Sequence, residues 1–177
     1  MKFELQPTLT GKLVELRPLR AGDFDALYAA ASDPLIWEQH PERRYDRAVF
    51  EQFFAEAMES GGALAVIERR SGKVIGTSRY AKLVPGEQVE IGWTFLERAY
   101  WGGEYNGEMK RLMLEHAFRF VERVVFTVAE KNLRSQKAVE KIGGVRVDTL
   151  TRTGPEGAPQ ENVVFAITRE AWKAVHA

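Results

Sequence analysis

EIGWTFLERAYWGGEYNGEMKRLMLEHAFRFV, residues 90–121, is the stretch that decides the fold. Its first seven residues are dense in β-branched and aromatic side chains, which predicts a strand. The Gly-rich segment 101–107 predicts a turn. A helix is predicted next, because apolar residues recur at intervals of three and four: Met109, Leu112, Met113, Ala117, Phe120 and Val121. Free N–H groups at a helix N-terminus attract anions, so the turn is a candidate phosphate site, with a simple chain reversal as the alternative.

The flanking sequence predicts strands and helices that belong to one α/β domain. The expected order is strand, two helices, three strands, helix, strand, helix and two strands. We therefore expect residues 1–177 to form a single domain, with a core over about 10–170, a mixed central β-sheet of about seven strands, and helices on both faces. In the central strand, predicted at 88–96, period-two alternation places Glu90, Gly92 and Thr94 on one face.

Composition excludes several classes of function. The 25 Lys and Arg residues balance 25 Asp and Glu residues, which argues against a protein that grips nucleic-acid phosphates. There is no Cys, so disulfides, thiolate catalysis and Cys-based zinc are excluded, and a reducing, cytoplasmic location is expected. The three His are far apart, so we expect no metal site. No segment has the apolar length of a membrane span or signal peptide, so no membrane partner is expected.

Four stretches, in this order, carry a family resemblance. They are LVELRPL at 13–19, Val74-Ile75-Gly76, Trp101-Gly102 before a helix, and Asn132-x-x-Ser135-x-x-x-x-Glu140-Lys141-x-Gly143. Together they resemble the GNAT superfamily of acetyl-CoA-dependent N-acetyltransferases, and within it the RimJ/RimL-like branch that acetylates ribosomal-protein N-termini. The resemblance implies the GNAT fold, acetyl-CoA as cofactor, and transfer of an acetyl group to a primary amine by direct attack, without a covalent enzyme intermediate.

The resemblance also implies where coenzyme A binds. In the GNAT fold a bulge splays the central strand from the next parallel strand, and the cofactor arm lies there against backbone groups near Trp93, Thr94, Phe95 and Leu96. The pyrophosphate then lies on the loop and helix start, with contacts expected at Trp101, Gly102, Gly103, Asn106, Gly107 and Lys110. Lys110 would supply compensating charge; its alternative reading is a solvated helix charge. Asn132 would bind the cofactor arm, and Ser135 would lie near the sulfur.

Three positions depart from the family pattern. Glu104 takes the place of a loop Gly, and a carboxylate beside a pyrophosphate is unfavourable, so we expect it to point outward. Val139 stands where many relatives carry a Tyr that protonates the leaving thiolate. Gly144 stands where relatives usually have Phe. These departures keep a non-catalytic acyl-CoA-binding relative open as an alternative, beside a plain protein-interaction domain.

The chemistry of acetyl transfer suggests roles for further residues. A Lys amine costs roughly 4–5 kcal/mol to deprotonate at pH 7, against about 1 for an α-amine, which weakly favours a peptide N-terminus or small amine as acceptor. Glu90 is the candidate general base through water, or else a surface carboxylate paired with Arg79 or a similar neighbour. Ser135 is the candidate to stabilise or protonate the thiolate.

The acceptor side is predicted from the branch resemblance. Its expected lining residues are Trp37, His40 and Tyr80, although core packing for Trp37 and simple exposure for His40 are the alternatives. The acceptor's identity stays open among ribosomal protein, other peptide, antibiotic, polyamine and amino acid. A homodimer through the late hairpin is a further option.

Overall fold

The computed structural model describes residues 2–176, and eight strands in this range form one mixed sheet. Their order across the sheet is β1-β2-β3-β4-β5-β6-β8-β7. The strands are β1 (Leu9–Thr10), β2 (Val14–Pro18), β3 (Ala63–Glu68), β4 (Val74–Val84), β5 (Gln88–Leu96), β6 (Arg123–Ala129), β7 (Val145–Thr153) and β8 (Pro159–Thr168). The predicted mixed sheet is confirmed, and β1 is an added two-residue edge strand, too short to show an alternation pattern.

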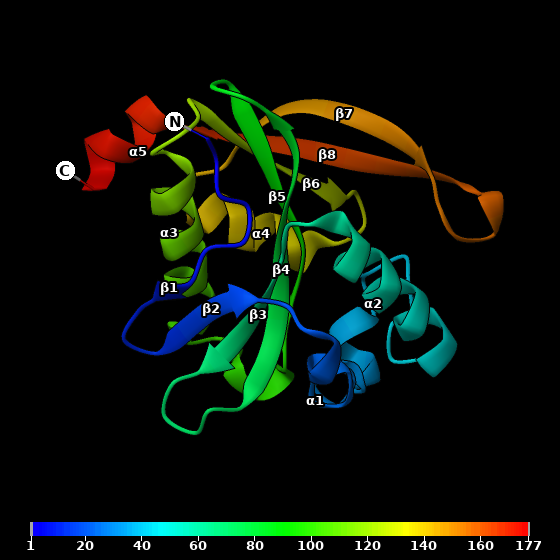
Figure 1. The fold of residues 1–177 in the computed structure, drawn as a ribbon. Coiled ribbons are helices and arrows are strands. Elements are labelled where there is room, and N and C mark those ends of the chain that lie inside the picture. Colours follow the sequence, from blue (N-terminus) through cyan, green and yellow to red (C-terminus); the bar gives the residue numbers. More distant parts are fainter. Residues whose placement is uncertain (1, 177) are drawn as a thin grey trace.

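Helices cover both faces of the sheet, as predicted (Figure 1). They are α1 (Phe24–Ala31), α2 (Arg47–Ser60), α3 (Tyr105–Ala117), α4 (Leu133–Lys141) and α5 (Arg169–His176). One core cluster packs α1 and α2 against one face through residues such as Leu27 and Phe50. The other cluster joins α3 and α5 to the opposite face through Met113 and Trp172. Among the helices of residues 2–176, none combines the length and apolar character that crossing a membrane requires.

Local sequence signals set most element bounds. Strand β5 begins and ends at the predicted residues 88 and 96. Helix α2 begins after Asp46, whose carboxylate accepts the Ala48 N–H at 2.9 Å. It ends at Gly61, whose φ of 72° lies in the left-handed region that glycine adopts without strain. The start of α2 is therefore explained by a side-chain cap, and its end by the backbone freedom of glycine.

Strand β5 separates from β6 after the first third of its length. The parallel pairing covers only residues 88–90 of β5 and 123–125 of β6. Within the described part of the chain, residues 91–96 have no strand partner on the β6 side. Trp93 has a φ of 52°, and the register with β4 shifts beside it, so a bulge lies at this point. The predicted splay of the central strand is confirmed.

The bulge changes which β5 side chains share a face. Glu90 Oε1 accepts a hydrogen bond from Thr127 Oγ1 at 2.7 Å. Thr94 Oγ1 instead accepts one at 3.0 Å from Lys110 Nζ, which comes from α3 on the opposite face. The prediction that Glu90 and Thr94 share a face is therefore wrong, because one extra residue at Trp93 reverses the alternation.

Candidate functional site

A cavity of about 1520 Å³ opens where β5 and β6 diverge. It is lined by the segment 36–44 before α2, the second half of β5, the loop 101–107, the inner side of α3, strand β6, the start of α4 and the turn between β7 and β8. Every predicted site residue except Tyr80 lies in its wall: Trp37, His40, Glu90, Trp93, Thr94, Phe95, Leu96, Trp101, Gly102, Gly103, Asn106, Gly107, Lys110, Asn132 and Ser135. Strand separation thus gathers residues that are up to about a hundred positions apart.

The loop before α3 presents a row of backbone donors. Among the hydrogen bonds of residues 2–176, none uses an N–H group of residues 102–107 as its donor. Gly102 makes the turn with a φ of 75°. Two hydrogen bonds hold the ends of the loop. Trp101 Nε1 donates to the Leu96 carbonyl at 2.9 Å, and Tyr105 Oη donates to Glu68 Oε2 at 3.0 Å. Free N–H groups on a fixed helix start suit an anionic group. The Glu68 anchor was not foreseen from sequence.

Glu104 is exposed at the cavity rim, and among residues 2–176 it has neither a side-chain capping bond nor an ion pair. Lys12 and Arg111 are among the basic residues that line the same cavity. The side chain of Glu104 is therefore not tied into the loop, and its outward orientation stays a prediction.

Lys110 is buried in the floor of the cavity, with 6% of its surface exposed. Its Nζ donates to Thr94 Oγ1 at 3.0 Å and lies 5.3 Å from the centre of the Phe126 ring. Burial lowers the pKa of the Lys110 amine from 10.5 to about 7. Lys110 is thus not a solvated helix charge, and its amine is hydrogen-bonded to β5, while its contact with a pyrophosphate stays a prediction.

The start of α4 forms another wall. Asn132 is its N-cap, with Oδ1 accepting the Ser135 N–H at 3.2 Å, and both residues line the cavity. Arg134, unforeseen from sequence, lies with its guanidinium 4.5 Å from the Trp101 ring centre and donates to Glu38 Oε1 at 2.5 Å. Arg134 therefore ties α4 to the segment before α2.

Glu90 is the buried carboxylate of the cavity wall, with 4% of its surface exposed. Besides its bond from Thr127, it has two cationic neighbours, Lys82 Nζ at 3.9 Å and Arg152 Nη2 at 3.6 Å. The alternative, a surface carboxylate paired with Arg79 or a similar neighbour, is met in its pairing, with Lys82 and Arg152 in place of Arg79, but Glu90 is buried and not on the surface. A carboxylate of this kind can accept a proton from a water or amine that enters the cavity.

The segment before α2 supplies aromatic and cationic groups. Trp37 is both core and cavity wall, and its indole N–H donates to the Ala31 carbonyl at 2.8 Å. His40 packs edge-on against Trp37, and its Nδ1 accepts the Glu42 N–H at 2.9 Å. Burial, followed by the charge of Arg44, lowers the pKa of His40 to about 3, so the imidazole is neutral at physiological pH. His40 is thus a packed wall residue and not a simply exposed one.

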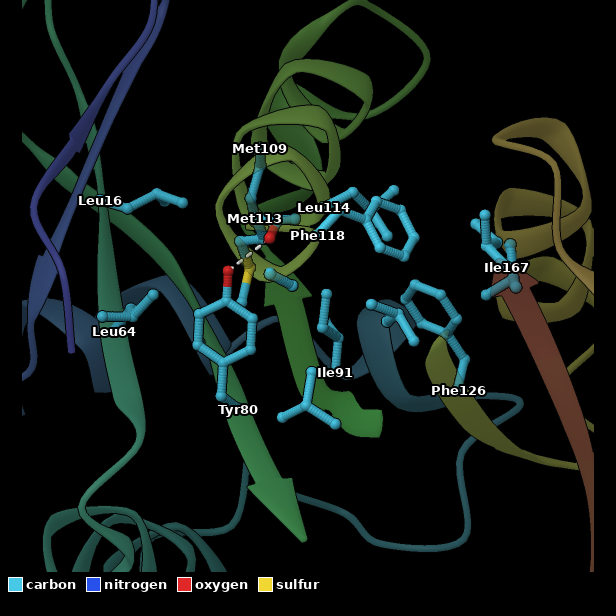
Figure 2. Close-up of a cluster of buried hydrophobic side chains, with 14 of the residues drawn as sticks. Leu16, Leu64, Tyr80, Ile91, Met109, Met113, Leu114, Phe118, Phe126 and Ile167 are labelled. Atoms are coloured by element: carbon cyan, nitrogen blue, oxygen red, sulfur yellow. Dashed lines mark hydrogen bonds between the residues drawn. The ribbon is translucent and has the colours of Figure 1, made fainter. Parts of the chain in front are cut away.

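Tyr80 is placed elsewhere. It is 1% exposed, belongs to the cluster on the α3 face, and donates its hydroxyl to the Met113 carbonyl at 2.5 Å (Figure 2). The prediction that Tyr80 lines the acceptor side is therefore wrong, and Tyr80 belongs to the core. The β4 alternation explains the difference, because the neighbouring Arg79 side chain points to the opposite face, against Phe53 and Trp93.

The comparisons with known proteins agree with this geometry. A family model described as Acetyltransferase (GNAT) domain matches residues 14–145. The chain belongs to the GNAT acetyltransferase family. It therefore carries an acetyltransferase domain, and the family resemblance predicted from sequence is confirmed.

Solved GNAT structures show the same fold. A GCN5-related N-acetyltransferase from Brucella melitensis has a TM-score of 0.85 at 24% identity, covering 96% of this chain and 82% of that one. RimJ from Mycobacterium smegmatis, solved with CoA-disulfide, has a TM-score of 0.68 at 22% identity, covering 93% and 88%. Spermidine N-acetyltransferase from Vibrio cholerae, solved with CoA and spermine, has a TM-score of 0.70 at 15% identity, covering 92% and 99%.

One departure from the GNAT pattern has a packing reason. A Cβ built on Gly144 would lie 2.5 Å from Val139 Cγ1 and 2.9 Å from the Val139 carbonyl oxygen, so no larger residue fits there. Val139 is buried and lines the cavity, where it offers no proton. Ser135, one helical turn earlier, is the hydroxyl of α4 in the same wall.

Proposed function

We propose that this GNAT protein transfers the acetyl group of acetyl-CoA to a primary amine by direct attack, within one domain spanning residues 1–177. The observation that carries the proposal is the cavity at the split between β5 and β6, which has a loop of free N–H groups at one end and the Glu90 carboxylate in its wall. The absence of Cys from the sequence fits a mechanism without a thiolate intermediate and a cytoplasmic location.

The residues around the split fit coenzyme A. The unpaired side of residues 91–96 offers backbone groups to an extended amide-bearing arm, and the N–H groups of 102–107 offer donors to a pyrophosphate. Asn132 and Lys110 also line the cavity, and because the Lys110 amine donates to Thr94 of the splayed strand, we assign Lys110 to the arm and not to the pyrophosphate. When bound, acetyl-CoA supplies the acetyl group as an activated thioester.

Residues of the cavity wall would accept and donate the protons that acetyl transfer requires. Glu90 accepts a proton from the attacking amine, directly or through one water, while Thr127 holds its carboxylate in place. An unpaired N–H of β5 polarises the carbonyl that is attacked. Ser135 provides the hydroxyl that meets the departing sulfur, since Val139 cannot.

Titration with acetyl-CoA, followed by thiol release on a panel of peptide, polyamine and small amines, tests the function. We expect saturable binding and turnover on at least one class of amine. Binding without turnover on any amine would favour the non-catalytic acyl-CoA-binding relative. Failure to bind coenzyme A would favour a protein-interaction domain.

A further inference from the structure

Arg79, on β4, carries a buried guanidinium that has no carboxylate beside it. The residue is 6% exposed, and its Nε and Nη2 atoms are buried without a hydrogen-bond partner in residues 2–176. The guanidinium carbon lies 4.5 Å from the centre of the Trp93 ring and 5.8 Å from that of Phe53. Burial, then the charge of Arg44, lowers the pKa of Arg79 to about 10, so it stays charged at neutral pH. A buried charge without a partner is unfavourable unless something completes the site.

Arg44 lies on the same aromatic cluster. Its guanidinium carbon is 4.3 Å from the centre of the Phe53 ring and 5.4 Å from that of Trp37. Arg44 is also 6% exposed and lines the cavity, and its ion pair is with Glu42 at 2.7 Å. Glu42 itself is open to solvent, with 43% of its side chain exposed.

The charges of this cluster do not balance. Two guanidiniums flank Phe53, and Glu42 is paired with Arg44 alone. Glu56 of α2 acts on both arginines only from a distance. One positive charge is therefore left in excess, in an apolar setting where water screens it weakly. Of the two arginines, Arg44 lines the cavity together with Trp37 and His40, whereas Arg79 lies against the ring of Trp93.

We propose that the acceptor amine carries a carboxylate, which Arg44 binds at the cavity wall while Arg79 adds its charge from behind Trp93. The proposal rests on the proposed acetyl transfer and names its acceptor class, a small amine with one carboxylate, such as an amino acid. The Nε and Nη2 atoms of Arg44 both contact Glu42 Oε2, so the acceptor carboxylate would accept a hydrogen bond from Nη1, and its single negative charge balances the excess. The neutral His40 beside Arg44 adds no competing cation. A polyamine would instead meet repulsion here.

The test compares acceptors that differ only in this charge. Thiol release is measured with glycine, β-alanine and γ-aminobutyrate, each against its amide. The ratio of kcat/KM for each carboxylate to kcat/KM for its amide is then compared between wild type and Arg44→Gln. The intrinsic reactivities of the two amines are the same for both proteins, so they cancel in this comparison. We expect the ratio to fall roughly tenfold, the size of one charge-assisted hydrogen bond. Arg43→Gln, an exposed neighbour, is the matched control and should leave the ratio unchanged.

A second measurement needs no variant. Trp37 and Trp93 lie beside the arginines, so tryptophan fluorescence of the CoA-loaded protein can be titrated with N-acetylglycine and with N-acetylglycinamide. We expect the carboxylate to bind roughly tenfold more tightly. Equal binding, or an unchanged kcat/KM ratio in Arg44→Gln, overturns the carboxylate site. Carboxylate-selective binding without turnover on any amine overturns the acetyl transfer and leaves the site standing.

Discussion

Replacing Lys110 by Met should stabilise the protein at neutral pH and flatten the pH dependence of its stability. The folded-state pKa of Lys110 is lowered from 10.5 to about 7, so between these values the unfolded chain binds more protons. The free energy of unfolding of the wild type therefore rises with pH across this window, by about 2 kcal/mol from pH 7 to pH 9. At pH 7 the charged amine costs roughly 4 kcal/mol relative to the unfolded chain. The Met variant also loses the hydrogen bond to Thr94, which offsets about 1 kcal/mol of the gain in stability.

Urea unfolding at pH 7, 8 and 9 measures this effect. Met has a similar unbranched shape, and Thr94 keeps its bond to Ser78 at 2.8 Å, so the substitution leaves no new unpaired hydroxyl. Lys137→Met, at an exposed position on α4, is the control and should follow the wild-type slope. Equal slopes for wild type and Lys110→Met, or a Met variant less stable at pH 7, would refute the reasoning.

Four further substitutions test the site and its surroundings. Glu90→Gln should lower kcat/KM by roughly 100-fold with acetyl-CoA affinity unchanged, and wild-type turnover would remove Glu90 from the base role. Glu104→Gln should tighten coenzyme A binding about threefold at low salt and not at high salt, as calorimetry can show. Gly144→Ala should lower stability by about 1–3 kcal/mol in urea because its Cβ meets Val139. Tyr80→Phe should lose about 1–2 kcal/mol while acetyl transfer is kept, and a loss of transfer would contradict its core position.

The fold was largely predictable because its signals are local. The alternation in β5, the Asp46 cap of α2 and the Gly-rich loop before α3 each depend on a few neighbouring residues. The loop and the start of α4 could be predicted for the same reason, as motifs between identified elements. The two-residue β1 could not, since a strand of this length has no pattern of its own.

The burial of single side chains was harder to predict, because it depends on partners distant in sequence. Lys110 reads as one of several polar residues on α3, and only the position of Thr94 opposite it shows that it is enclosed. Arg43 and Arg44 are adjacent arginines in a polar segment. Arg44 packs against Phe53, whereas Arg43 is exposed. No pattern of spacing distinguishes the enclosed cation from the solvated one.

The bulge at Trp93 is the feature that connects these observations. One residue with a left-handed backbone interrupts the regular alternation of β5, three residues after the pairing with β6 ends at Glu90. On one side of the sheet it brings Thr94 to Lys110, in the floor of the expected acyl-donor cavity. On the other side it leaves the Trp93 ring over Arg79, at the proposed acceptor end. The donor and acceptor ends of the site thus depend on the same irregular residue. Because this residue reverses the side-chain alternation, a strict period of two places Thr94 on the wrong face.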